Sequence, residues 1–151
     1  MLDDTDRRIL RQMQAAPDVT GAELAERAGL SPATLSRRVE RLRDTGILRG
    51  VRAEIDWKVL GYSVEVSLRV TLDKSEPRAF DEFAAAARVV PEVIEIQTFL
   101  GQVDARLSVI ARDMAHYQQV YRGQILTLPH ITDVDALMHV ARLKTDESLP
   151  L

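Results

Sequence analysis

One stretch, residues 30–46, constrains the fold more than any other because it carries signals for both ends of a helix. Ser31 suits the N-cap position, where a hydroxyl accepts a hydrogen bond from a free N–H of the first turn. Pro32 suits the first helical position, and Gly46 suits the left-handed residue just past the end. Apolar side chains spaced four and three residues apart then share one face of this helix, namely Leu35, Val39 and Leu42.

The other side of this helix carries small, hydroxylic and cationic residues. A short helix over residues 22–28 precedes it, and Gly29 stands in the turn between the two. Two helices joined by a short turn, the second with a basic outer face, are typical of a helix-turn-helix that places its second helix in the DNA major groove. An ordinary helical hairpin with a solvated basic face is the alternative. The residues expected to contact DNA are Ser31, Pro32, Thr34, Ser36, Arg37, Arg38 and Arg41. For Arg38, an internal ion pair is an equally good expectation.

The distribution of charge supports a DNA-facing end. The whole chain has a net charge of -3, but residues 27–52 hold seven basic and two acidic side chains, a local charge of +5. From residue 61 onward, nine basic residues stand against thirteen acidic ones, a charge of -4. This asymmetry predicts a basic end that binds nucleic acid and an acidic remainder.

Composition narrows the class of protein further. The 151 residues contain no cysteine, which excludes disulfides and thiolate metal sites. No signal peptide and no apolar run long enough to span a membrane is visible. We therefore expect a cytoplasmic protein without a membrane contact, a metal or a cofactor.

The pattern along the chain predicts two domains. A first helix, capped by Asp3 or Asp4 and ending near Gln14, completes a three-helix unit, and residues 47–55 read as a strand pair, the wing. Arg49 and Arg52 of the wing are expected either to reach phosphate or to be solvated. Trp57 is expected to pack at a hinge rather than to stack on a ligand. The domains are expected at 1–50 for the helix-turn-helix, 51–62 for a linker and 63–151 for a second domain.

The second domain alternates strands and helices. Residues 64–72 show a two-residue apolar period, which is typical of a half-buried strand. A helix follows over 77–88, strands over 93–100 and 105–111, a helix over 114–126 and a strand over 131–143. The sequence around Pro91 resembles the sequence around Pro129, which predicts two copies of a βαβ unit. The expected fold class is therefore α+β: a winged helix-turn-helix followed by a ferredoxin-like βαββαβ domain. Apolar residues left on the second sheet face predict a partner subunit, as does the two-fold symmetry of DNA half-sites.

Short motifs along nearly the whole chain resemble those of the Lrp/AsnC transcription regulators. They include Gly29-Leu30-Ser31-Pro32, Gly46-Ile47-Leu48, Leu60-Gly61, Pro91-Glu92-Val93, Gly101 with Asp104, Leu128-Pro129 and Leu149-Pro150-Leu151. The resemblance implies a winged helix-turn-helix, a domain that senses small amino acids, and homodimers that often assemble into octamers.

The resemblance also implies an effector site. In this family a Gly-x-Tyr-Asp turn between two strands lines a pocket between dimers, and its aspartate faces the ammonium group of the ligand. Gly101 and Asp104 match this pattern, although both residues are also common in simple turns. Val103 replaces the usual aromatic residue, and Ala136 stands where the family tends to have a hydroxyl. Arg106 is expected to pair with Asp104 or another acid, or else to hold the carboxylate of an unusual effector. We therefore expect either a ligand preference that differs from that of a simple leucine or asparagine sensor, or a weak response to an effector.

Two other functions remain open at this point. Siroheme decarboxylases resemble the same family in fold, but the three histidines, His116, His130 and His139, lack the spacing of metal ligands. A DNA-organising protein without an effector is the other alternative. Steep loss of DNA affinity with salt would favour a DNA binder over an enzyme.

Overall fold

The computed structural model describes residues 2–144 and 148–151. The chain divides into two compact units, one formed by Met1–Glu54 with Lys144–Leu151 and the other by Ile55–Leu143. The described part of the C-terminal segment, which the sequence pattern groups with the second domain, thus lies in the first unit. There Leu151 packs on the apolar core, and the backbone N–H of Leu149 donates to Gln14 Oε1 (2.6 Å).

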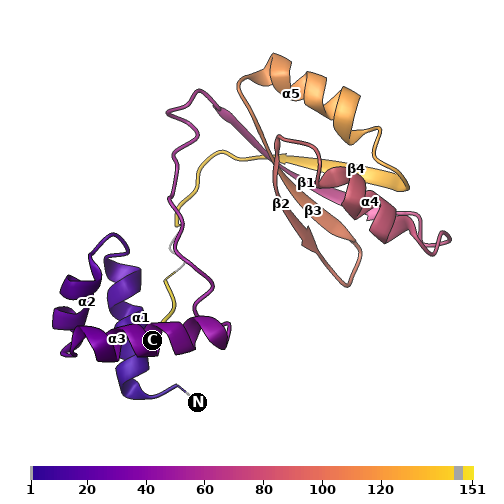
Figure 1. Ribbon diagram of the computed structural model, residues 1–151. Coiled ribbons are helices and arrows are strands. Elements are labelled where there is room, and N and C mark those ends of the chain that lie inside the picture. Colours follow the sequence, from indigo (N-terminus) through magenta and orange to yellow (C-terminus); the bar gives the residue numbers. More distant parts are fainter. Residues whose placement is uncertain (1, 145–147) are drawn as a thin grey trace. The chain divides into compact units, whose positions relative to one another are not determined.

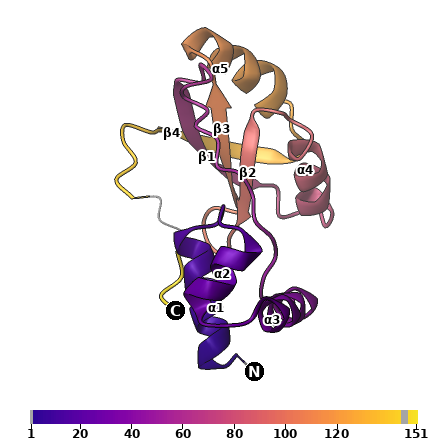
Figure 2. The same ribbon diagram turned by 60° about the vertical axis from the view of Figure 1, so that its left-hand side comes forward.

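The first unit contains three helices, α1 (Asp4–Ala15), α2 (Gly21–Ala28) and α3 (Pro32–Asp44) (Figures 1 and 2). Local signals define their ends: Asp3, Thr20 and Ser31 are the N-caps, and Gly29 closes α2 in the left-handed conformation. The helices enclose a small core of Ile9, Leu10, Leu24, Ala25, Ala28, Leu35 and Leu42. The predicted three-helix unit is confirmed.

The predicted wing strands do not form. Residues 47–55 hold no strand, and most of them are exposed. The backbone N–H of Leu48 instead donates to the carbonyl of Leu42 and closes the end of α3 (2.9 Å). This N–H is therefore not available to a neighbouring strand, and Gly50 has a φ of 149°. The segment forms no β-ladder although its sequence partly alternates.

The second unit is a four-stranded antiparallel sheet with two helical segments. Its elements are β1 (Val64–Leu72), α4 (Ala79–Ala87), β2 (Val93–Thr98), β3 (Ala105–Ala111), α5 (Met114–Val120), the π-helical turn η1 (Tyr121–Ile125) and β4 (Ile131–Met138). The strand order β2-β3-β1-β4 with this βαββαβ sequence is the predicted ferredoxin-like arrangement.

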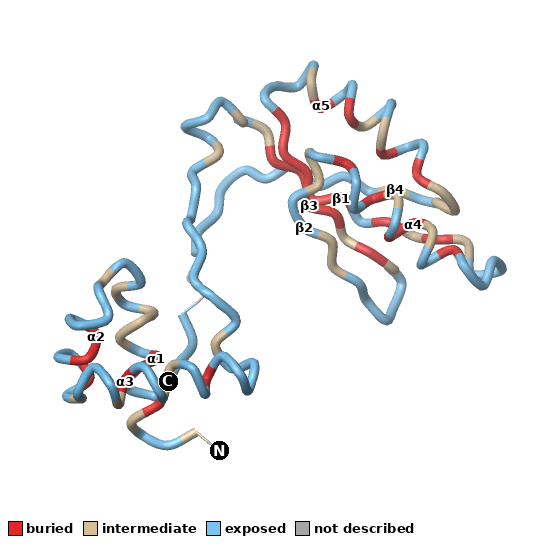
Figure 3. The backbone as a smooth tube through the Cα atoms, viewed as in Figure 1, coloured by how far each residue is buried: buried red, intermediate tan, exposed pale blue. Residues whose placement is uncertain are grey.

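The core of this unit lies between one face of the sheet and the helices. Val66, Leu68 and Val70 of β1 meet Phe83 of α4 and Tyr117 of α5, and all five are buried. Figure 3 shows this buried zone along the central strands and the inner sides of the helices. The two-residue apolar period of residues 64–72 therefore correctly predicted which face of β1 packs on the helices.

Several predicted boundaries differ from the structure, and α4 spans Ala79–Ala87 where the sequence predicts a helix over 77–88. The last strand ends at Met138 instead of Leu143, and the N–H of His139 just beyond it donates to the Glu65 carbonyl (3.0 Å). β2 ends at Thr98 rather than Leu100, where the hairpin turn begins. The second helix of this unit loosens into η1 after Val120.

The sheet face opposite the helices, here called the open face, carries Glu65, Ser67, Arg69, Arg106, Ser108, Ile110 and Leu137. It is more polar than the sequence pattern suggested. Near one end, the buried Glu65 carboxylate pairs with Arg142 and lies 3.3 Å from His139 Nδ1. The Arg142 guanidinium also lies over the half-buried Trp57 ring, 5.6 Å from its centroid. Trp57 therefore packs against its own chain.

Candidate functional site

Helix α3 begins at Ser31 as its sequence predicts. The Ser31 hydroxyl accepts from the backbone N–H of Thr34 (3.3 Å) and donates to the Thr34 hydroxyl (2.9 Å), and Pro32 opens the first turn. At the other end Gly46 adopts φ 71° just past the C-cap Thr45. Both hydroxyls of the first turn thus lie at an accessible helix N-terminus, which is suited to contact with phosphate or base edges.

The next turn of α3 presents a free cation. Leu35 is buried in the core of the unit, whereas its neighbours Ser36 and Arg37 are exposed. Within the described part of the chain, no hydrogen bond or ion pair holds the Arg37 side chain. An exposed and uncommitted guanidinium near the start of this helix can make the bidentate contact that guanine offers in the major groove.

Arg38 and Arg41, in contrast, are engaged inside the unit. Arg38 Nη1 donates to Asp3 Oδ2 (2.7 Å) and Asp6 Oδ1 (2.9 Å), and Arg41 Nη2 donates to Asp6 Oδ2 (2.5 Å). Asp6 is fully buried, although aspartate residues are rarely fully buried. For Arg38 the internal ion pair is therefore the observed state. Arg41, which is expected to contact DNA, also bonds to the buried carboxylate, although its side chain stays 52% exposed.

The same cluster stabilises the start of α1. Asp3 and Asp6 form a capping box in which each side chain accepts the backbone N–H of the other (2.8 and 3.2 Å). The hydrogen bond from Arg38, followed by that from the Asp6 backbone, lowers the pKa of Asp3 to about 2. The hydrogen bonds from Arg38 to the side chains of Asp3 and then Asp6 raise the pKa of Arg38. The four side chains Asp3, Asp6, Arg38 and Arg41, here called the α1–α3 ion cluster, therefore fix α3 against α1.

The candidate effector residues lie mainly on the β2–β3 hairpin. Gly101 is exposed at its tip, and a Cβ built there meets nothing within 4 Å. The Asp104 carboxylate accepts the backbone N–H of Leu72 through Oδ2 (2.8 Å), and its Oδ1 lies 3.6 Å from Lys74 Nζ. Asp104 therefore joins the hairpin to the end of β1, and only one of its oxygens has room for a further strong partner.

The remaining candidates are not gathered around this hairpin within one chain. Val103 is half buried beside Asp104. Arg106 lies on the open face, where Nη2 is 3.5 Å from Glu95 Oε2, so it pairs with an acid across the sheet and not with Asp104. Ala136 is exposed on β4, in register with Leu68, and β4 and β2 are opposite edges of the sheet.

The histidines each approach a carboxylate. His130, a non-glycine residue at φ 63°, has Nε2 2.6 Å from Glu82 Oε2. This contact, followed by that of Arg78, lowers the pKa of Glu82. His116 Nε2 lies 3.4 Å from Glu92 Oε1, so these rings join neighbouring elements of the second unit. Among the residues that the structure describes, no group of three or more His, Cys, Asp or Glu could hold a metal ion.

Comparison with known proteins identifies the family. The model of the Lrp/AsnC ligand binding domain matches residues 65–149, and a winged helix-turn-helix DNA-binding model matches residues 2–49. The chain belongs to the Lrp/AsnC family. Its relatives include the HTH-type transcriptional regulator Zrp of Zymomonas mobilis, 32% identical over 99% of this chain and 97% of that protein. The leucine-responsive regulatory protein of Escherichia coli is 30% identical over 98% and 90%.

Solved structures of Lrp/AsnC proteins share the complete fold. A transcriptional regulator of Neisseria meningitidis in complex with L-methionine has a TM-score of 0.91 and 29% identity, covering 99% of this chain and 97% of the other. AsnC of Escherichia coli has a TM-score of 0.87 and 27% identity over 96% of each chain. The feast or famine regulatory protein of Mycobacterium tuberculosis, complexed with L-methionine, has a TM-score of 0.88 and 27% identity over 99% of each.

Sequence reasoning missed two buried acids, Asp6 and Glu65. Asp6 shares the inner face of α1 with Ile9, Leu10 and Met13 at helical spacing, whereas Glu65 stands at a polar position in the alternation of β1. Arginines from distant parts of the chain pair with both carboxylates. Nothing in the neighbouring residues identifies those arginines as partners.

Among the described helices, none is long and apolar enough to cross a membrane.

Proposed function

We propose that this chain is a sequence-specific DNA-binding transcriptional regulator of the Lrp/AsnC type that acts in the cytoplasm and reads DNA with the first two turns of α3. The observation that carries the proposal is the exposed Arg37, which no described group engages, beside Ser36 and the capped first turn. Ser31, Pro32 and Thr34 would contact the DNA backbone or base edges at the same end.

Arg38 and Arg41 have a different part in this proposal. Their bonds to Asp6 hold α3 at a fixed angle to α1, so that the reading end is presented in one orientation. The Arg41 side chain is still 52% exposed and uses one of its five N–H groups on Asp6, so it can also meet a phosphate. The Arg38 side chain is 24% exposed and acts mainly inside the unit.

We further propose that the regulator is a homodimer that assembles to an octamer, with the open face as a subunit contact. Ile110 is buried there, but Leu137 remains about half exposed on this side of the sheet. Two α3 helices related by a two-fold axis would then match two DNA half-sites.

The effector is proposed to be a small amino acid, as in the two methionine complexes of the family. Gly101, Val103 and Asp104 would contact it from one subunit, with Arg106 and Ala136 contributing where subunits meet. In support, the space above Gly101 is open, and Asp104 Oδ1 has only a long contact with Lys74. A change in assembly on binding would then change the spacing of the α3 pair and the affinity for DNA.

The decisive experiment is a gel shift with fragments upstream of the protein's own gene, with sizing of the same samples. Arg37→Ala is expected to weaken binding about 10-fold or more, the effect of losing one base contact, and to leave the oligomer unchanged. Arg11→Ala, an exposed arginine on α1, is the matched control and is expected to bind normally. Equal binding by wild type and Arg37→Ala would refute the assignment of the reading end.

A second experiment tests the effector. A panel of amino acids in a thermal-shift assay is expected to show stabilisation of the wild type that is lost in Asp104→Asn, because the amide no longer offers a charged partner to the ammonium. An unchanged response in that variant would remove Asp104 from the site. DNA binding that no metabolite changes would favour the DNA-organising alternative.

A further inference from the structure

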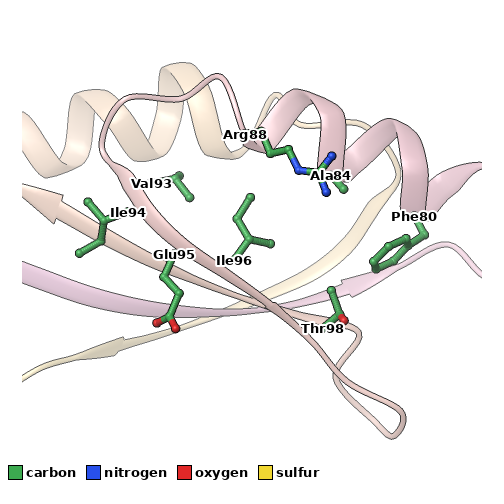
Figure 4. Close-up of a pocket in the computed structure, with 8 residues that line it drawn as sticks. All are labelled: Phe80, Ala84, Arg88, Val93, Ile94, Glu95, Ile96 and Thr98. Carbon is green, nitrogen blue, oxygen red and sulfur yellow. The ribbon is translucent and has the colours of Figure 1, made fainter. Parts of the chain in front are cut away.

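A groove of about 330 Å³ lies between α4 and the edge strand β2 and reaches Thr98, the last residue of β2. Figure 4 shows Val93 and Ile96 on the side of β2 that faces α4, with Phe80 and Arg88 near the two ends of that helix. The volume is at the lower end of the range for small-molecule sites, so an occupant of few atoms is implied.

The groove contains a cation without a counterion. Arg88 is exposed, and in the described residues no hydrogen bond or ion pair joins its side chain to another group. Nearby arginines differ in this respect: Arg78 Nη2 lies 2.5 Å from Glu82 Oε1, and Arg106 pairs with Glu95. A free guanidinium is suited to bind a carboxylate in a forked geometry.

The groove offers no free acid in return. Glu95 lies at its rim but points to the side of β2 away from α4 (Figure 4). Its Oε2 lies 3.5 Å from Nη2 of Arg106. An ammonium group placed beside Arg88 would therefore find no described carboxylate to pair with. This is the opposite of the proposed site at Asp104, where an acid is available for an ammonium group.

The walls of the groove are apolar and partly uncovered. Phe80 is 43% exposed and Ile94 44% exposed, and β2 has no strand on its outer side. Covering such side chains with an apolar group is favourable, by roughly 25 cal/mol for each Å² removed from water. The Thr98 hydroxyl at the far end of the groove adds one polar group.

We propose that this groove binds a small carboxylate with a branched apolar tail, with the carboxylate on Arg88 and the tail along Ile94, Ile96 and Phe80. The absence of an available acid favours a 2-oxo acid over the corresponding amino acid. This inference rests on the proposed function as an effector-responsive regulator, and it adds a second ligand site of opposite charge preference to the one at Asp104.

The test is isothermal titration of the full-length protein with 4-methyl-2-oxopentanoate and, separately, with L-leucine. The wild type is expected to bind the 2-oxo acid, and Arg88→Gln to bind it about 10-fold or more weakly, since a charged hydrogen bond is lost. Arg122→Gln, an exposed arginine on η1, is the matched control and should bind normally. Ile94→Glu adds a negative charge at the groove without touching the core and should also weaken binding.

The outcomes separate this inference from the proposed function. Loss of 2-oxo acid binding in Arg88→Gln but not in Asp104→Asn supports the groove, whichever way the DNA experiment ends. L-Leucine binding with the same dependence on Arg88 supports the carboxylate site and assigns it to amino acids. Equal binding by Arg88→Gln and wild type, or no saturable binding at millimolar concentration, overturns the inference. Dissociation of the oligomer by Ile94→Glu with ligand binding unaffected also overturns it, because a second copy would then cover the groove.

Discussion

Replacing the buried Asp6 tests whether the α1–α3 ion cluster holds the DNA-reading helix in place. The Asp6 carboxylate accepts two charged hydrogen bonds, from Arg38 and Arg41, and the backbone N–H of Asp3 (2.9, 2.5 and 3.2 Å). Hydrogen bonds to a charged group contribute about 1.5–3 kcal/mol each, so the three bonds to this carboxylate give an upper range of about 4.5–9 kcal/mol. Both arginines are partly exposed and regain water when released, so we expect Asp6→Ala to destabilise the first unit by about 3 kcal/mol.

The assay is hydrogen exchange of α3 amides together with urea unfolding followed by circular dichroism. Asp6→Asn keeps the shape of the side chain and should cost less than Asp6→Ala. Asp4→Asn, an exposed acid in the same first turn, is the control and should change stability by less than about 0.5 kcal/mol. Amides of β1 report on the second unit and should exchange as in the wild type. If Asp6→Ala lies within 1 kcal/mol of the Asp4→Asn control, roughly the contribution of one hydrogen bond, the cluster does not hold α3.

Two further perturbations test the ends of α3 and α1. Gly46→Ala should cost about 1–2 kcal/mol in urea unfolding, because φ is 71° and a left-handed alanine is strained although its Cβ would meet no atom within 4 Å. Gly21→Ala, at an ordinary φ, should be neutral or stabilising. An NMR titration should give Asp3 a pKa of about 2, rising toward its ordinary value in Arg38→Gln. Since the folded pKa is lowered, the Asp3 contribution to stability is complete above about pH 4 and is lost as pH falls to about 2.

The sequence predicted those features of the fold that depend on neighbouring residues. Ser31, Pro32 and Gly46 lie within the same helix and its caps, so their roles follow from propensity and hydrogen bonding at helix ends. The alternation along β1 likewise indicated which face is buried, because side chains of a strand point to opposite sides in turn. The βαββαβ order then left few possible topologies.

Features that depend on contacts between distant residues were not predictable in the same way. Asp6 and Arg41 are 35 positions apart, and nothing in either segment shows that α1 and α3 bring them within 2.5 Å. The wing was predicted from alternation in residues 47–55, but a strand also needs a partner, and sequence alone does not supply one. The sites proposed for DNA and effector remain predictions for the same reason, since their partners are other molecules.

The ion cluster also changes how the charge of the DNA-binding end should be counted. The value of +5 for residues 27–52 includes Arg38 and Arg41 but omits Asp3 and Asp6, which face them from α1. Two of the seven basic residues are thus compensated within the unit, and fewer phosphate contacts follow than the sequence count implies. Each phosphate contact adds about 0.9 to the magnitude of the slope of log affinity against log salt concentration. Removing a free arginine that contacts phosphate should therefore reduce this slope more than removing an arginine that is paired within the unit. Arg38→Gln should leave that slope nearly unchanged, whereas replacing the exposed Arg43 should lower it by about 1 if that residue meets a phosphate.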